Sequence, residues 1–439
     1  MEISSLILTI IKNWWWFILL IILYFPSKFL YLWWIRWEVW YKKQNWILLE
    51  VKPPKEILKP FKAMENVFSI LWGVYDGANW RERWCEGELI KGPYWISFEI
   101  ASLGGEIHFF LRVLKIHREM VEAAIYSQYP DAEISLADDY TKNVPPDIPN
   151  KDWDLYGEDY SLMREDTYPI KTYLAFFEPR GEAVTQEEKR IDSIDSLLES
   201  LTKLKPSEQF WFQIVAAPIL DKDIPWKTAG EKLRDKLARR KVPPKPRSLL
   251  QEVADVIITG TPTVSPPKVE EFLPPEMKLT PGERETLAAV ENKISKYGFK
   301  TWIRIIYLHK REEPYFIGNN KIVRAYLNQF LAHGLNGFVY WGPARTRIHY
   351  VFRKRRLYMR KRNQFRHYIE RLPSTFPRSM EGNLPLFHIG PKGPGIRATI
   401  ILNTEELATI YHLPSKVIVP TLPYVEAKKG GPPPELPTE

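Results

Sequence analysis

The chain has a single cysteine, Cys85, among its 439 residues. A lone cysteine excludes a disulfide framework and a cysteine-based metal cluster, and it is typical of a reducing compartment. Two catalytic motifs are missing as well: the sequence has no Gly-x-x-x-x-Gly-Lys-Ser/Thr phosphate loop and no Gly-x-Ser-x-Gly turn. The eight histidines never lie three or four residues apart. The histidine spacing therefore indicates no helical metal site, and we expect no cofactor.

Long apolar runs are absent after residue 45, and the one candidate lies near the start of the chain. Uncharged apolar residues run from Trp14 to Phe25, and the pattern extends back to Leu6, which approaches the ~20 residues that a spanning helix needs. Lys12 interrupts the run at a cost of roughly 3 kcal/mol. The pattern predicts a membrane anchor and juxtamembrane helix over residues 1–45. The predicted anchor residues are Trp14, Trp15, Trp16, Phe17, Trp33, Trp34 and Trp37.

Two other interpretations fit this segment less well. A signal peptide would need a positive start and a small-residue cleavage site, and neither is present. A water-soluble core helix does not account for tryptophans clustered as in an interfacial belt. Basic residues follow the apolar run, whereas Glu2 is the only charged side chain before Lys12. The positive-inside rule then predicts a single-pass inner-membrane protein with its bulk in the cytoplasm and lipids as partners.

Residues 46–140 follow the order strand, helix, two strands, helix, strand. Apolar residues alternate along 96–100 and 107–113, around a turn at Gly104-Gly105, and recur at helical spacing on either side of this hairpin. This order predicts a ferredoxin-like unit. The expected strands are 46–51, 96–100, 107–113 and 132–136, and the expected helices are 61–71 and 120–129.

The same order recurs after an acidic linker loop, residues 141–170. Residues 171–344 predict a second ferredoxin-like unit, interrupted by a helical insertion over 222–298 in which Thr280 and Glu283 form a capping box. The expected strands are 172–177, 210–215, 301–307 and 337–341, with helices over 194–204 and 322–331. The overall fold class is thus α+β: a transmembrane helix, two tandem ferredoxin-like units and a tail. One larger α+β domain with a different strand order is the alternative.

Residues 373–439 are rich in proline and glycine, which predicts an extended tail. One short helix is expected over 403–411, with Asn403 or Thr404 as its N-cap.

The acidic residues between positions 138 and 159 could bind a divalent cation through their oxygen atoms. A solvated loop accounts for them more simply.

A basic segment over residues 345–372 carries much of the net charge of +9. Aromatic residues such as Tyr350 and Tyr358 are interleaved with its cations. This composition suits single-stranded nucleic acid, anionic lipid headgroups, an acidic partner, or a plain solvated helix. The predicted anion-binding residues are Arg345, Arg347, Arg353, Lys354, Arg355, Arg356, Arg360, Lys361, Arg362 and Arg366.

Several phrases resemble a known but uncharacterised type of sequence. They are KAMENVF (Lys62–Phe68), VEAAIYSQYPDAEI (Val121–Ile134), YPIKTY (Tyr168–Tyr173), LNTEELATIYHLP (Leu402–Pro414) and PPPELP (Pro432–Pro437). Together they resemble the membrane-anchored region that precedes conjugation-type ATPases in candidate-phyla bacteria. Those ATPases are similar to type IV secretion coupling proteins and to the FtsK and HerA translocases. The resemblance runs from about residue 46 onward and transfers no catalytic residue.

The resemblance implies an ATP-driven transfer machine, whereas this sequence supplies no ATP site. We therefore expect the motor to be a separate P-loop ATPase, or this chain to be the anchor part of a longer one. The implied role is a non-catalytic scaffold of a type IV secretion-like or conjugative DNA-transfer complex, assembled as a ring. The tail from Leu402 would dock on a hexameric ATPase. The expected docking residues are Asn403, Glu405, Glu406, Tyr411 and His412. The alternative is a membrane-tethered nucleic-acid-binding module that uses residues 345–371.

Overall fold

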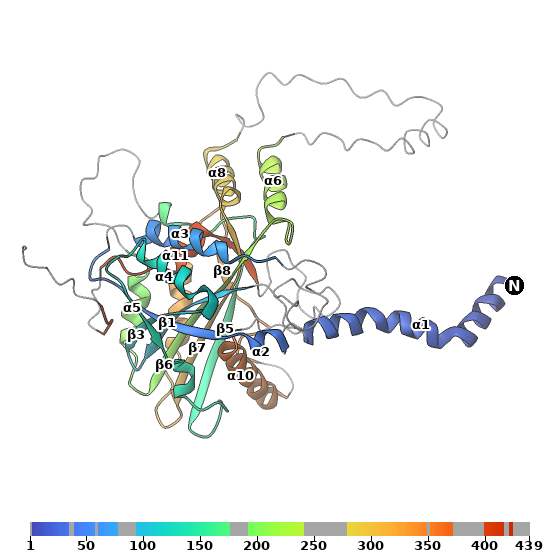
Figure 1. Cartoon of the computed structure of the whole chain (residues 1–439), viewed down its shortest axis with the longest axis horizontal. Coiled ribbons are helices and arrows are strands. Elements are labelled where there is room, and N and C mark those ends of the chain that lie inside the picture. Colours follow the sequence, from blue (N-terminus) through green and yellow to red (C-terminus); the bar gives the residue numbers. More distant parts are fainter. Residues whose placement is uncertain are drawn as a thin grey trace, which may run out of the picture.

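The computed structural model describes residues 2–34, 39–57, 60–77, 94–175, 192–240, 279–348, 352–371, 399–416 and 421–424. Their strands form one nine-stranded antiparallel sheet (Figure 1). Neighbouring strands follow the order β4-β1-β3-β2-β6-β7-β5-β8, and β9 pairs with β7. The strands are β1 (Trp46–Lys52), β2 (Ile96–Leu103), β3 (Glu106–Leu114), β4 (Glu133–Ala137), β5 (Trp153–Leu162), β6 (Glu208–Ile219), β7 (Gly298–Lys310), β8 (Phe338–Tyr340) and β9 (Ile400–Asn403).

The predicted fold class, a transmembrane helix followed by two ferredoxin-like units, is wrong. The sheet does not stop between the halves of the chain, because β2 pairs with β6 along its whole length, from Ile96 opposite Ala216 to Leu103 opposite Gln209. This pairing buries both strands in the middle of the sheet. The result is one continuous sheet, and its core crosses the boundary at which two units were expected.

The acidic linker loop predicted over 141–170 is also wrong at its centre, where β5 lies. This strand pairs with β7 from Trp153 opposite Lys310 to Tyr160 opposite Ile303. The strand expected over 172–177 is instead a short 3-10 helix over Tyr173–Ala175, and residues 176–177 lie outside the described part of the chain. Charged residues within β5 hid the strand pattern, because they are buried against partners far along the chain.

Among the described residues, a layer of helices covers one face of the sheet, and the long helix α10 lies on the other (Figure 1). Tyr140, Val144 and Ile148 pack on that second face as well. Strand alternation separates the two cores. On β6, Phe210 and Phe212 belong to the core beneath the helical layer, whereas Trp211 packs with Phe365 and Tyr368 of α10. The helices of the layer are α3 (Pro60–Leu71), α4 (Arg118–Tyr126), α5 (Asp195–Thr202), α9 (Ile322–Asn328) and α11 (Thr404–Ile410). Helix α10 spans Arg353–Ile369.

Between β6 and β7 the described residues form two helices that pack side by side, α6 (Trp226–Leu237) and α8 (Pro281–Ser295) (Figure 1). The predicted capping box of α8 is confirmed: Thr280 accepts a hydrogen bond from the Glu283 backbone, and the Glu283 side chain accepts one from the Thr280 backbone. Residues 241–278 of the predicted insertion lie outside the described residues.

The first described part of the tail is a core element. Strand β9 pairs with β7, and α11, which starts at the predicted cap Asn403, packs against α3. The buried ammonium of Lys293 in α8 contacts Glu406 at 3.0 Å and donates to the Ile401 carbonyl at 3.0 Å. These contacts hold the segment against α8. The other tail residues at 372–398 and 425–439 lie outside the described residues.

The N-terminal helix α1 (Glu2–Trp34) is 33 residues long and contains Pro26. Among the described residues, none of the helices combines the length and the apolarity that crossing a membrane requires. The predicted transmembrane anchor and the single-pass inner-membrane location are therefore wrong. The apolar run from Trp14 to Phe25 is short of the ~20 residues needed, because Lys12 and Asn13 precede it and Pro26 follows. The exposed aromatic residues of α1 in the described set include Trp14, Trp15, Trp16, Phe17 and Trp34, while Trp37 lies outside it and nothing is described of the Trp33 side chain.

A buried side-chain contact joins His412, just after α11, to Asp192, just before α5. His412 Nε2 lies 2.6 Å from Asp192 Oδ1, and Asp192 also accepts from the backbone of Ser415 at 2.7 Å. Burial alone would raise the pKa of Asp192, but the charge and hydrogen bond of His412 outweigh it and lower the pKa to about 2. At the neighbouring Asp195 the pKa moves in the opposite direction. Burial, and then the charge of Asp192, raise the pKa of Asp195 to about 7.

We predict that Asp195→Asn stabilises the protein at pH 8 and leaves its stability unchanged at pH 4. A raised carboxyl pKa in the folded state means that stability falls as the pH rises from about 4 to about 7, because the unfolded chain ionises first. The expected gain at pH 8 is about 1–2 kcal/mol, discounted for the partial exposure of the side chain. Urea unfolding at the two pH values measures it. The control is Glu199→Gln, an exposed carboxyl group on the same helix; an equal gain in the control would contradict the account.

Candidate functional site

A row of buried polar side chains crosses the middle of the sheet on the face that α10 covers. Glu99 of β2 lies opposite Gln213 of β6, Gln213 lies opposite Arg304 of β7, and Arg304 lies opposite Asp159 of β5. All four are at most 1% exposed. Gln213 Nε2 donates to Glu99 at 3.0 Å, and Arg304 Nε donates to Asp159 at 2.9 Å. Such groups are stable in a core only when they are paired. A segment that packs on this row must therefore offer complementary polar groups.

Helix α10 and the turn that follows it contact this row through three residues. Gln364 donates to Asp159, and the backbone carbonyl of Tyr368 accepts from Gln213 at 3.4 Å. Arg371 binds Glu99 through two nitrogens, at 3.0 and 3.1 Å. Gln364 and Tyr368 lie four residues apart in α10, and Arg371 lies in the turn after it, with φ +53°. The C-terminal half of the helix is therefore held in a single register against the sheet.

Arg371 also binds Asp139, with nitrogen–oxygen distances of 2.7 and 3.0 Å. Burial would raise the pKa of Glu99 and of Asp139, but the guanidinium outweighs burial in both cases and lowers the pKa, to about 2 for Asp139. Tyr140 donates to Glu99 at 2.7 Å, and its hydroxyl lies 2.8 Å from that of Tyr368. The buried charges thus satisfy one another, and the cluster secures the C-terminal end of α10.

Gly157 of β5 lets α10 approach the sheet closely. A Cβ atom at this position would lie 2.7 Å from Cγ of Gln364. The backbone amide of Gly157 donates to the Thr346 hydroxyl at 2.9 Å, and the Gly157 carbonyl accepts from the backbone amide of Thr346 at 3.0 Å. The loop that precedes α10, residues 341–348, is therefore fastened to the same strand as the helix.

The predicted cations divide into two sets in this setting. Some belong to internal contacts: Arg345 pairs with Glu158 at 2.8 Å, Lys361 with Asp154 at 2.6 Å, and Arg360 donates to the Arg345 carbonyl at 2.9 Å. Arg366 is exposed and pairs with Glu370 along the helix. The others are exposed too, and no ion pair with another described residue holds them. These exposed cations are Arg347, Arg353, Lys354, Arg355, Arg356 and Arg362.

Four of the exposed cations, residues 353–356, occupy the first turn of α10. A helix N-terminus already carries a partial positive charge, and like charges three or four residues apart repel. Phe352, at the N-cap, makes no side-chain capping bond. This arrangement costs the folded chain stability, and a bound anion would reverse the cost.

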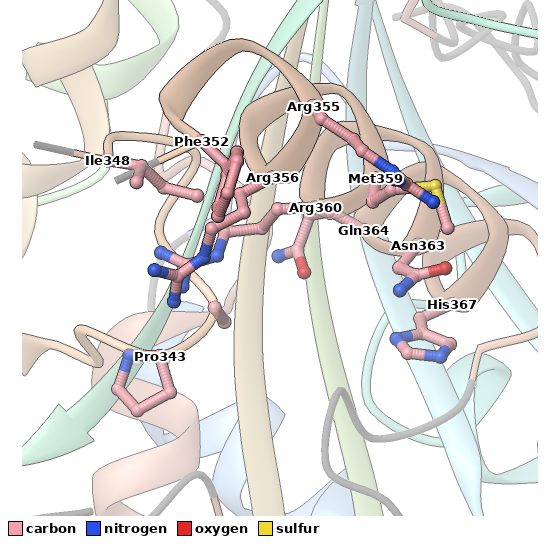
Figure 2. Close-up of a pocket in the computed structure, with 11 residues that line it drawn as sticks. Pro343, Ile348, Phe352, Arg355, Arg356, Met359, Arg360, Asn363, Gln364 and His367 are labelled. Carbon is pink, nitrogen blue, oxygen red and sulfur yellow. The ribbon is translucent and has the colours of Figure 1, made fainter. Parts of the chain in front are cut away.

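A groove of about 550 Å³ runs beside α10, between the helix and the loop that precedes it (Figure 2). Arg356 and Arg360 reach to the same side of the helix as Phe352, toward Pro343, whereas Asn363 and His367 lie farther along the helix. The lining residues are Pro343, Ala344, Ile348, Phe352, Arg355, Arg356, Met359, Arg360, Asn363, Gln364 and His367. The groove joins apolar walls to guanidinium groups.

The residues expected to dock an ATPase lie inside the molecule. Asn403, Glu405, Glu406, Tyr411 and His412 are each at most 1% exposed. Asn403 caps α11, Lys296 pairs with Glu405, and Lys293 pairs with Glu406. In this conformation none of the five is available to an external partner, and their spacing reflects the packing of α11.

The acidic residues considered for a divalent cation are also used internally. Asp139, Asp154, Glu158 and Asp159 pair with arginine and lysine side chains. Within the described ranges, no group of three or more histidine, cysteine or acidic residues is arranged to hold a metal ion. The sequence alone did not reveal the polar row, because each of its members lies in a different strand.

Residues 40–317 match the family model described as a domain of unknown function, DUF8128. The match covers more than half of the chain, so the chain belongs to this family. It includes β1 to β7 and ends before β8 and α10. No curated protein matches the chain.

We predict that Arg371→Leu destabilises the protein by about 3–5 kcal/mol, because it leaves Glu99 buried without its cation. The double variant Arg371→Leu/Glu99→Leu should recover part of this stability, since it removes the unpaired charge as well. Arg362→Leu is the control: it removes an exposed arginine of the same helix and should change stability by no more than about 0.5 kcal/mol. Denaturant unfolding of the three variants measures the difference. Equal effects of the two single substitutions would contradict the role given to the buried row.

Proposed function

We propose that this chain is a non-catalytic nucleic-acid-binding subunit and that the exposed cations of α10 bind phosphate groups. The observation that carries the proposal is the division of the basic segment. Arg345, Arg360 and Lys361 make internal contacts. Five exposed cations that form no ion pair with another described residue lie in the first turn of α10, at positions 353–356, and at Arg362. Arg347 adds a sixth just ahead of the helix.

Several physical features support phosphate as the ligand. The guanidinium group matches phosphate geometry with two parallel donors. The first turn of α10 places four cations where the helix dipole is positive, which is unfavourable for folding and favourable for an anion. The rigid inner face keeps the outer cations in place, so binding requires little further ordering of the helix. A polyanion can bind several of these side chains at once, whereas a single carboxylate cannot.

The wider setting that we propose is the DNA-transfer complex that the sequence phrases resemble, in which this chain would be a scaffold for a separate hexameric ATPase. The support is the resemblance itself, whose phrases around Lys62–Phe68 and Leu402–Pro414 lie in α3 and in the β9–α11 segment, which pack together. The docking surface would have to be a different one from the buried residues 403–412.

Co-purification tests this second candidate. If the chain is such a scaffold, it should purify with the ATPase encoded beside its gene, in a stoichiometry that fits a ring. A chain that purifies alone, with that ATPase present and folded, would contradict the scaffold and leave the nucleic-acid proposal standing.

For the binding itself, we predict that Arg355→Glu/Arg356→Glu lowers the affinity for DNA at least tenfold at low salt. The slope of log K against log salt should also fall by about 1 for every phosphate that the variant no longer binds. The matched control is Lys203→Glu/Lys321→Glu, which changes the net charge equally at exposed positions beside the helical layer of the opposite face. Fluorescence anisotropy across a salt series measures both quantities. Equally weakened binding in the two variants, or no affinity of the natural chain for DNA, would contradict the proposal.

A further inference from the structure

The groove beside α10 begins at an exposed and strained aromatic residue. Phe352 is 78% exposed, the highest value among the large hydrophobic side chains of the described residues. Its φ angle is +58°, in the left-handed region, which bulky side chains rarely adopt. A residue held in this region costs the fold stability, and such strain is concentrated at binding and catalytic sites. With its ring in solvent, Phe352 contributes little to the core in return.

Phe352 shares one side of α10 with other groove residues. Arg356, Met359 and Asn363 follow it at intervals of four, three and four, which places them along one stripe. Met359 is 52% exposed, and Asn363 carries both a hydrogen-bond donor and an acceptor. Figure 2 shows Phe352 beside Arg356, with Met359 and Asn363 farther along the helix. The stripe therefore offers, in order, an aromatic ring, a cation, an apolar contact and a polar edge.

We infer that this groove takes an unpaired nucleobase, so that the ligand of α10 is single-stranded nucleic acid. This inference rests on the proposed function and adds to it the class of nucleic acid. The base would stack on the ring of Phe352 and contact Met359, while Arg355 and Arg356 bind the flanking phosphates. A groove of about 550 Å³ has room for a base with its sugar. Aromatic stacking with neighbouring cations is how proteins bind single strands with little sequence preference.

A duplex does not satisfy this geometry. Its bases are stacked and paired, so none can enter the groove without the cost of unpairing. A helix that reads duplex DNA inserts one side into the major groove and contacts base edges there. The side of α10 that faces the sheet is occupied by the polar row, so that side is not available to enter a major groove.

The test measures the affinity of the full chain for three probes of equal length: a single-stranded oligothymidine, the same strand with abasic sites, and a duplex. The natural chain should bind the oligothymidine roughly tenfold more tightly than the abasic strand, a ratio that corresponds to one stacked base. Phe352→Ala should remove this preference, and Phe352→Trp should retain it. Phe316→Ala, an exposed phenylalanine that does not line the groove, is the control and should behave as the natural chain.

The outcomes separate the two proposals. Equal affinity for all three probes, unchanged by Phe352→Ala, would overturn the base-binding groove and leave phosphate binding in place. No binding of any probe at low salt would overturn the proposed function itself. If polyglutamate displaces the oligothymidine as effectively as unlabelled oligothymidine does, the groove belongs to an acidic protein partner, and both nucleic-acid proposals fail. Because Phe352 is exposed, its variants should keep the unfolding midpoint of the natural chain.

Discussion

The contact of Arg371 with Glu99 and Asp139 places helix α10, and the exposed surface of the basic segment depends on it. Arg371 lies more than two hundred residues along the chain from both carboxylates, and each of the three side chains is buried or half-buried. A guanidinium in this position is stable only while both carboxylates accompany it. Glu99 lies in β2 and Asp139 follows β4, so the contact requires the strands β4-β1-β3-β2 to be paired in register. The rest of the row, on β6, β7 and β5, contacts Gln364 and the Tyr368 carbonyl, and α10 then has one orientation.

This arrangement gives α10 two sides with different roles. The inner side uses charge and hydrogen bonds to determine register, and so the helix does not depend on a wide apolar stripe. The outer side is left with cations that repel one another at the positive end of the helix dipole. The inner contacts offset the cost of that repulsion. A ligand with several negative charges would remove this repulsion on binding, and the free energy released would add to its affinity. The packing of the helix is thereby connected to the proposed function.

Part of this fold was predictable from the sequence. Alternation located β2, β3, β6 and β7, and the cap at Asn403 located α11, because those signals are local. Strand β5 was missed because Asp154, Glu158 and Asp159 resemble a solvated loop until their distant partners are known. The continuity of the sheet was missed because no local pattern encodes which strands pair across β2 and β6. The membrane prediction failed because tryptophans and a twelve-residue run do not amount to a spanning length. For the site, the sequence located the basic segment but not which of its cations are exposed, since that depends on long-range pairing.

The most direct test of the central claim is hydrogen–deuterium exchange of the whole chain with and without a single-stranded oligonucleotide. The account predicts slower exchange on binding in the first half of α10, residues 353–362, where the cations are exposed. It predicts already slow and unchanged exchange at residues 364–371, which the buried row holds in both states. Protection that appears only elsewhere, for example in α6 and α8, would contradict the account and move the binding surface away from α10.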